Sequence, residues 1–145
     1  MLTCLKAKPC FSKAGVHADS RSEGIVFNTL EKLGEVYVTH PGYPGSSWQA
    51  DAYLINRKLW VEAYGGSDPI VNPSKGASDY YQRMEEKKKY FHCNPQLGYL
   101  LVIYPSVIWE PAFAERLKKW LENFEQVKET RRSNVYKVGT YWTKK

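Results

Sequence analysis

Apolar residues recur at helical spacing in three stretches of the chain. Residues 20–34 (SRSEGIVFNTLEKLG) start with Ser20 and Glu23 placed as in a capping box, and Gly34 ends the pattern. Two further amphipathic patterns cover residues 77–92 and 110–127. The sequence therefore predicts three helices of moderate length.

Short apolar runs bounded by turn residues predict the strands. They occupy residues 35–40, 49–55, 59–64 and 97–105, and the last run is continuously apolar, as in the centre of a sheet. A final hairpin is expected over residues 133–142, with its bend near Gly139.

The expected order is helix, three strands, helix, strand, helix and a closing pair of strands. An antiparallel meander followed by a crossover helix gives an α/β fold whose mixed central sheet is flanked by helices on both faces. At 145 residues the chain is predicted to be one domain. We divide it into a polar lead-in (1–19), a core (20–128) and a basic C-terminal segment (129–145).

Two carboxylates, Asp51 and Glu62, interrupt the predicted hairpin of residues 49–64. A turn at residues 56–57 sets them directly opposite each other, and a turn at residues 57–58 sets them diagonally on the same face. Cross-strand neighbours have Cβ atoms about 5 Å apart, so the two charges repel unless a positive charge lies between them. The alternative is an acidic pair that faces solvent.

The apolar stripe of the first predicted helix also contains an acid. At 100° per residue the stripe contains Val26, Phe27, Leu30 and Leu33, and Glu23 falls within it near its N-terminal end. Glu23 therefore caps the helix or reaches the neighbouring sheet, and these two roles are compatible.

The helix at residues 77–92 turns a lysine inward. Its inward arc has four members: Tyr80, Met84, Lys87 and Phe91. Of the three consecutive lysines only Lys87 lies on this face, with Lys88 at its edge. A buried ammonium needs an anionic partner, because desolvating it alone costs several kcal/mol. The alternative is a lysine that extends past the rim of the core.

Together these residues have the chemistry for phosphodiester hydrolysis. Asp51 and Glu62 hold Mg²⁺ or Mn²⁺, with the main-chain carbonyl of Ala63 as a further ligand and Glu23 acting through water. The metal lowers the pKa of a bound water, and Lys87 orients that water or stabilises developing charge. The predicted catalytic residues are Glu23, Asp51, Glu62 and Lys87.

Residues 20–105 resemble the PD-(D/E)xK nuclease superfamily, through SEGIVFNTLEKLG, ADAYL and WVEAYGG. The family lysine two residues after the second acid is Tyr64 here. Some branches carry this lysine on the following helix, in a pattern similar to Tyr80, Arg83, Lys87 and Tyr90. The resemblance implies a restriction-endonuclease-like αβββαβ core and nuclease activity.

The formal net charge of +6 favours a polyanionic partner, for which we expect DNA. The residues predicted to contact DNA are Lys75, Arg83, Lys88, Arg131, Arg132 and Lys137. Cutting both strands of a duplex or junction usually takes two sites, so we expect a homodimer.

Membrane, secretory and zinc-binding classes receive no support from the sequence. No apolar run is long enough to span a bilayer, and the N-terminus lacks a signal-peptide pattern. The three cysteines have no paired spacing, which favours reduced thiols in the cytoplasm and argues against a zinc site.

The sequence therefore predicts a Mg²⁺-dependent DNA endonuclease. Two alternatives stay open: a nuclease-fold protein that binds DNA without cutting it, and an unrelated basic nucleic-acid-binding domain.

Overall fold

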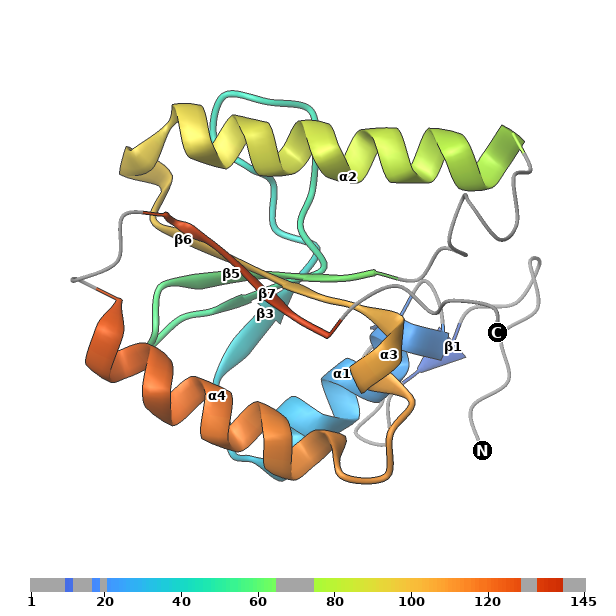
Figure 1. Cartoon of the computed structure of the whole chain (residues 1–145), viewed down its shortest axis with the longest axis vertical. Helices are drawn as coiled ribbons and strands as arrows, with labels where there is room; N and C mark the ends of the chain where they lie inside the picture. Colours follow the sequence, from blue (N-terminus) through green and yellow to red (C-terminus); the bar gives the residue numbers. More distant parts are fainter. Residues whose placement is uncertain (1–9, 12–16, 19–20, 65–74, 129–132, 140–145) are drawn as a thin grey trace.

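The chain forms a mixed α/β structure around one five-stranded sheet (Figure 1). The computed structural model describes residues 10–11, 17–18, 21–64, 75–128 and 133–139, and the side chains of residues 21–64, 81–128 and 133–139. Among these residues, no helix is long and apolar enough to cross a membrane.

The sheet has the strand order β3-β4-β5-β6-β7. Strands β3 to β5 pair antiparallel, whereas β6 pairs parallel with β5 and β7 pairs parallel with β6. The five strands are β3 (Tyr37–Thr39), β4 (Ala52–Leu54), β5 (Leu59–Ala63), β6 (Tyr99–Ile103) and β7 (Val135–Val138). A separate antiparallel pair, β1 (Cys10–Phe11) and β2 (His17–Ala18), precedes the first helix. The predicted mixed sheet is confirmed.

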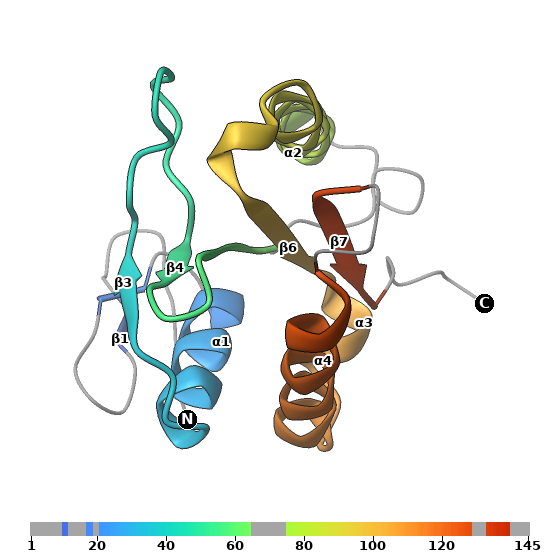
Figure 2. The ribbon, with the colours of Figure 1, turned by 90° about the vertical axis from the view of Figure 1, so that its left-hand side faces the viewer.

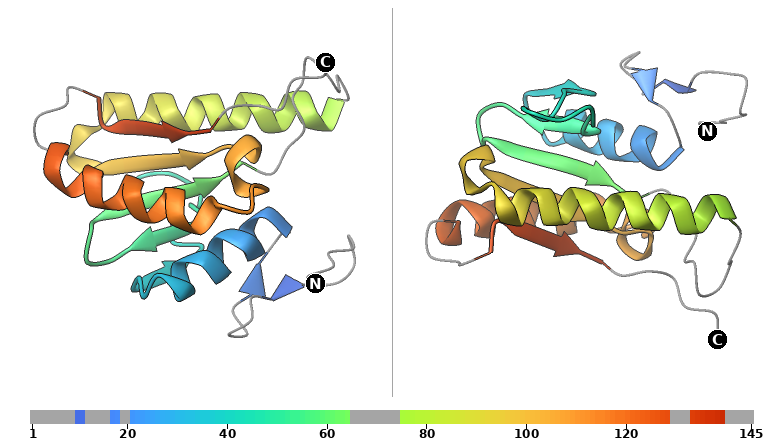
Figure 3. Two further views of the ribbon diagram at one scale, coloured as in Figure 1. Left: turned by 60° about the horizontal axis from the view of Figure 1, so that its bottom comes forward. Right: turned by 90° about the horizontal axis from the view of Figure 1, so that it is seen from above.

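Helices cover both faces of the sheet (Figures 2 and 3). On one face lie α1 (Arg21–Lys32) and α4 (Phe113–Val127), which pack on the side chains of β4 and β5 that alternate toward them. On the other face lies α2 (Lys75–Cys93), which packs through Met84 and Phe91. The three predicted helices are thus confirmed, each within a few residues of its expected bounds.

The first helix ends as its sequence predicts. Gly34 has a φ of +75°, its N–H donates to Glu31, and the N–H of Glu35 donates to Leu30. This is the Schellman arrangement, in which glycine adopts the left-handed conformation without steric cost. The predicted capping partner at the other end, Ser20, lies outside the described residues.

Two elements differ from expectation at the C-terminal end of the core. A short helix, α3 (Pro105–Ile108), follows β6 directly, with proline at its first turn, where a missing N–H costs nothing. β7 was predicted as one arm of a hairpin, and the structure adds a parallel pairing with β6, reached through α4. The expected second arm, residues 140–142, lies outside the described residues.

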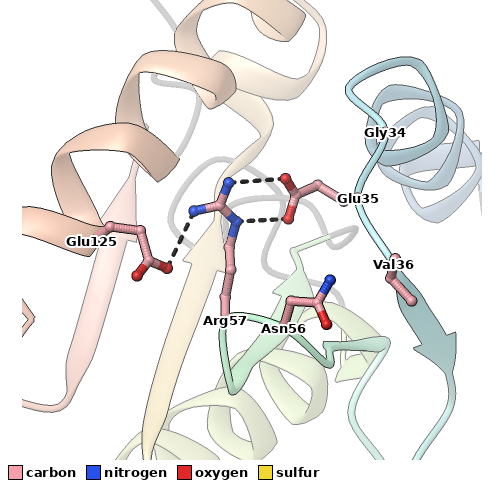
Figure 4. A pocket seen from close by; sticks show the side chains of 6 residues that line it. All are labelled: Gly34, Glu35, Val36, Asn56, Arg57 and Glu125. Carbon is pink, nitrogen blue, oxygen red and sulfur yellow. Dashed lines mark hydrogen bonds and ion pairs between the residues drawn. The ribbon is translucent and has the colours of Figure 1, made fainter.

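Arg57 fastens the β4–β5 loop to two other segments at one end of the sheet (Figure 4). Its guanidinium donates to both carboxylate oxygens of Glu35, at 2.6 and 2.9 Å, and to Glu125 of α4 at 3.2 Å. It also donates to the carbonyl of Leu121 at 3.3 Å. The surrounding cavity of about 270 Å³ thus contains an arginine whose charge is already matched by two acids.

We expect Arg57→Ala to lower the free energy of unfolding by about 1.5–3 kcal/mol, the usual value of hydrogen bonds to a charged group. Arg116→Ala is the matched control, because the Arg116–Glu110 pair is exposed at both ends and such pairs contribute about 0–1 kcal/mol. Urea unfolding followed by circular dichroism measures both. Equal losses in the two variants would contradict the assigned role of Arg57.

Candidate functional site

The β4–β5 hairpin sets Asp51 beside Glu62. Ala52 pairs with Val61 and Leu54 with Leu59, the register expected for a turn centred on residues 56–57. The loop has four residues and not two, and this even number keeps the predicted facing intact. The regular ladder stops at Ala52, and the N–H of Asp51 also donates to the carbonyl of Val61, at 3.1 Å, so Asp51 and Glu62 are neighbours without being a regular cross-strand pair.

Glu62 points toward the face that α2 covers. Its neighbour two residues earlier, Trp60, packs with Met84 and Phe91 of α2, and alternation along a strand gives Glu62 the same direction. Glu62 is only 1% exposed. Burial of a carboxylate at this depth requires charged or hydrogen-bonding partners.

Two partners meet the same oxygen of Glu62. The ammonium of Lys87 lies 2.9 Å from Oε2, and the hydroxyl of Tyr43 donates to Oε2 at 2.7 Å. The predicted inward position of Lys87 is therefore confirmed. The alternative of a lysine that extends past the core does not hold, since Lys87 stays 17% exposed and contacts Glu62 directly.

Tyr43 comes from the loop between β3 and β4, which lies on the same side of the sheet as α2 (Figure 2). Tyr90 donates to the carbonyl of Pro44 at 2.5 Å, and Trp48 meets Tyr90 edge to face. Lys87 also donates to the main-chain carbonyl of Gln49 at 3.1 Å. The lysine thus joins the loop, the helix and the strand at one point.

Glu23 reaches the same region from the opposite side of the sheet. It is 6% exposed on α1, and Nε2 of His40 lies 2.8 Å from its Oε1. His40 adopts a φ of +52°, uncommon for a residue other than glycine, and its N–H donates to the carbonyl of Asp51. His40 therefore connects the carboxylate of Glu23 to the main chain of Asp51.

The charges of two other acids act on the carboxyl group of Asp51. Burial raises the pKa of the Asp51 carboxyl well above its ordinary value, and the charges of Glu62 and Glu23 raise it further. The N–H of Ala63, which donates to Oδ2 of Asp51 at 2.6 Å, and the charge of Lys87 act in the opposite direction. Among the described residues, the carboxylates of Asp51 and Glu62 have one ammonium group, that of Lys87, to offset their charge, so the site favours an added proton or cation.

The hydroxyl of Tyr43 stays protonated in this surrounding. Burial raises its pKa well above the ordinary value, and the charges of Glu62 and Asp51 raise it further. Tyr43 therefore acts as a hydrogen-bond donor that holds the orientation of Glu62.

Of the residues predicted to contact DNA, the side chains of Arg83, Lys88 and Lys137 are described, and Lys88 and Lys137 line one groove between α2 and β7. Arg83 and Lys137 are exposed, on α2 and β7. Lys88 is 8% exposed and its ammonium is bonded to Glu85 at 2.6 Å and to Tyr104 at 2.5 Å. It faces inward, so the expectation that Lys87 alone turns toward the core is wrong. Arg131, Arg132 and the side chain of Lys75 lie outside the described residues.

Two residues of the site, Tyr43 and His40, were not predicted for it from the sequence. Both lie in a stretch rich in proline and glycine, THPGYPGSS, where no periodic pattern indicates direction. An aromatic hydroxyl and a histidine inside such a loop were the available signal, but their partners depend on how the loop folds back on α2.

Within the described part of the chain, no three His, Cys, Asp or Glu side chains are arranged to hold a metal ion by themselves. No protein-family model, curated protein or solved structure matches this chain.

Without divalent cations, we expect Asp51→Asn to be more heat-stable than the wild type at pH 8, with a difference that shrinks toward pH 4. The folded pKa of Asp51 is raised, so its stabilising contribution is complete below the unfolded pKa and is lost as the pH rises through the folded value. Thermal unfolding in EDTA measures the difference.

The control is Glu122→Gln, on an exposed position of α4, where no such dependence is expected. A difference for Asp51→Asn that does not change with pH, or that grows toward acid, would contradict the crowding of the three carboxylates.

Proposed function

We propose that this chain is a divalent-cation-dependent endonuclease that hydrolyses phosphodiester bonds of DNA. The supporting observation is the meeting of Asp51 and Glu62 with Lys87, whose ammonium lies 2.9 Å from Glu62, while Glu23 adds negative charge at Asp51. Among the described residues, the carboxylates of Asp51 and Glu62 outnumber the ammonium of Lys87. An excess of carboxylates suits a metal cation, and the ammonium beside them suits a phosphate.

The donor set fits a hard cation such as Mg²⁺ or Mn²⁺. Among the described residues, nothing hydrogen-bonds Oδ1 of Asp51 or Oε1 of Glu62, so each acid keeps one oxygen for a metal. We assign Asp51, Glu62 and the carbonyl of Ala63 as ligands, and Glu23 as a ligand through water. Two carboxylates and a carbonyl suffice for Mg²⁺, which usually retains several waters.

A bound cation would supply a water of lowered pKa and neutralise charge on the scissile phosphate. The chain's own groups then position the reactants. Lys87 donates to the attacking water or to a phosphate oxygen, while Tyr43 holds the carboxylate that Lys87 also contacts. His40 holds the carboxylate of Glu23.

The element order α1, β3, β4, β5, α2, β6 agrees with a restriction-endonuclease-like core, which we propose as the finer description of the fold. Tyr64 occupies the position where that superfamily most often carries its lysine. It is fully buried and stacks on Tyr104, so we assign the lysine function to Lys87. A homodimer is the arrangement we propose for cutting both strands.

The test of this function is a set of DNA substrates: end-labelled linear duplex, flap and four-way junction, and unlabelled supercoiled plasmid. We expect cleavage of at least one of them with Mg²⁺, none with EDTA, and a loss of at least about 100-fold in Asp51→Asn. Glu122→Gln should cut like the wild type.

The alternatives predict different results. DNA binding that ignores Mg²⁺, without any cleavage, identifies a nuclease fold that binds but does not cut. DNA binding that also ignores Asp51→Ala identifies an unrelated basic domain. Either result rejects the proposed endonuclease.

Lys87→Gln should lower the cleavage rate constant at saturating DNA by about 100-fold or more, the usual effect of removing one donor to a transition state. The variant should also lose about 1.5–3 kcal/mol of stability, because buried Glu62 loses a charged hydrogen bond. Rates are therefore compared at a temperature where circular dichroism shows both proteins folded.

Lys118→Gln removes an equal charge from an exposed position of α4 and is the control. Full activity in Lys87→Gln would remove Lys87 from the mechanism.

A further inference from the structure

A groove of about 570 Å³ runs between α2 and the edge strand β7. The right-hand view of Figure 3 shows α2 lying along this side of the sheet. Its lining comes from α2 and from the segment that contains β7: Glu85, Lys88, Lys89 and His92 on the helix, and Ser133, Val135, Tyr136 and Lys137 on the other wall. None of these side chains belongs to the site built on Asp51 and Glu62.

The groove carries net positive charge. Lys88, Lys89 and Lys137 line it together with a single acid, Glu85. Glu85 bonds to Lys88 at 2.6 Å, which leaves the charges of Lys89 and Lys137 without a described acidic partner. The ammonium groups of Lys89 and Lys137, on opposite walls of the groove, are therefore available to bind an anion.

The side of the groove next to the core is built around a buried lysine. The hydrogen bonds that Lys88 makes to Glu85 and Tyr104 raise the pKa of its ammonium, so it stays charged despite the opposing effect of burial. These two bonds use two of the three ammonium donors. The third donor has no acceptor among the described residues.

Strand alternation directs Lys137 toward the groove. Val135, two residues earlier on β7, is buried beneath α2 and Lys137 points to the same face. Lys137 is nevertheless exposed, because it lies on the edge strand where the helix no longer covers the sheet. Its charge is presented beside the helix.

The length of the groove favours a polymer over a single small anion. From Glu85 to His92 the helix advances about 10 Å, which corresponds to about three nucleotide steps of one DNA strand. Arg131 and Arg132 directly precede Ser133 in the sequence and lie outside the described residues.

We propose that the groove between α2 and β7 binds the sugar-phosphate backbone of a nucleic acid. Lys89 and Lys137 contact phosphate oxygens, and the free donor of Lys88 completes the site. Lys87 and Lys88 project from α2 about 100° apart, so the groove holds the nucleic acid on the flank of the helix away from Glu62. That this nucleic acid is also the substrate rests on the proposed function.

The test compares two double variants of equal charge change. In Lys89→Ala/Lys137→Ala we expect about a tenfold or greater loss of affinity for a labelled duplex, measured by fluorescence anisotropy in EDTA at 100 mM salt. The slope of log affinity against log salt should shrink by about two, one for each lost phosphate contact. Lys118→Ala/Lys119→Ala, on exposed positions of α4 across the sheet, should change affinity less than twofold.

Equal losses in both double variants, or no loss in the groove variant, would overturn the inference. Inorganic phosphate is added at constant ionic strength as a second arm. Stabilisation of the wild type but not of the groove variant by millimolar phosphate in thermal unfolding, with DNA affinity unchanged in the groove variant, would assign the groove to a small phosphate and also overturn it. Thermal unfolding verifies that the exposed substitutions leave the fold intact.

Cleavage is scored separately with Mg²⁺, which distinguishes this inference from the proposed function. If the groove variant binds poorly and the wild type never cuts, the groove stands and the endonuclease fails. If the wild type cuts but the groove variant binds normally, the endonuclease stands and the groove fails.

Discussion

A carboxylate that is 1% exposed cannot be accommodated without compensation, and the contact between Lys87 and Glu62 supplies it. The ammonium comes from α2, the carboxylate from β5, and the loop between β3 and β4 adds the hydroxyl of Tyr43 and the carbonyl of Gln49. One ion pair therefore fixes how the helix, the sheet and the loop lie relative to each other. The loop in turn leans on Tyr90 of the same helix, so the contact and its surroundings support one another.

The ion pair of Lys87 and Glu62 does not neutralise the negative charge of the acids around it. Asp51 and Glu23 bring negative charge from the hairpin and from α1, and the raised pKa of Asp51 is the direct consequence. A fold that needed only stability would gain from replacing such acids by apolar residues. Among the described residues, two buried carboxylates, Asp51 and Glu62, face the one ammonium of Lys87, and this arrangement is the physical basis of the proposed hydrolysis. The groove between α2 and β7 has the opposite balance, with exposed lysines in excess over Glu85, and so suits a polyanion without a metal.

Periodicity was sufficient to predict the sheet, the three main helices and the facing of the hairpin, since each depends on local spacing. The inward direction of Lys87 followed from the 100° step of a helix. The same step placed Lys88 only at the edge, because a helical wheel does not include tertiary partners such as the hydroxyl of Tyr104, which directly follows β6. The parallel pairing of β7 was not predicted, because it depends on distant β6 and local turn signals indicated only a hairpin. Tyr43 and His40 were missed for a related reason: in an aperiodic loop, partners are set by tertiary folding.

We propose that the carboxylates of Asp51 and Glu62 together bind one divalent cation beside Lys87. Crystals soaked in Mn²⁺ and measured near the manganese absorption edge test this directly. We expect an anomalous difference peak within about 2.3 Å of an oxygen of each of these two acids. A well-ordered site without such a peak at millimolar Mn²⁺, or a peak bound only elsewhere on the molecule, would contradict it.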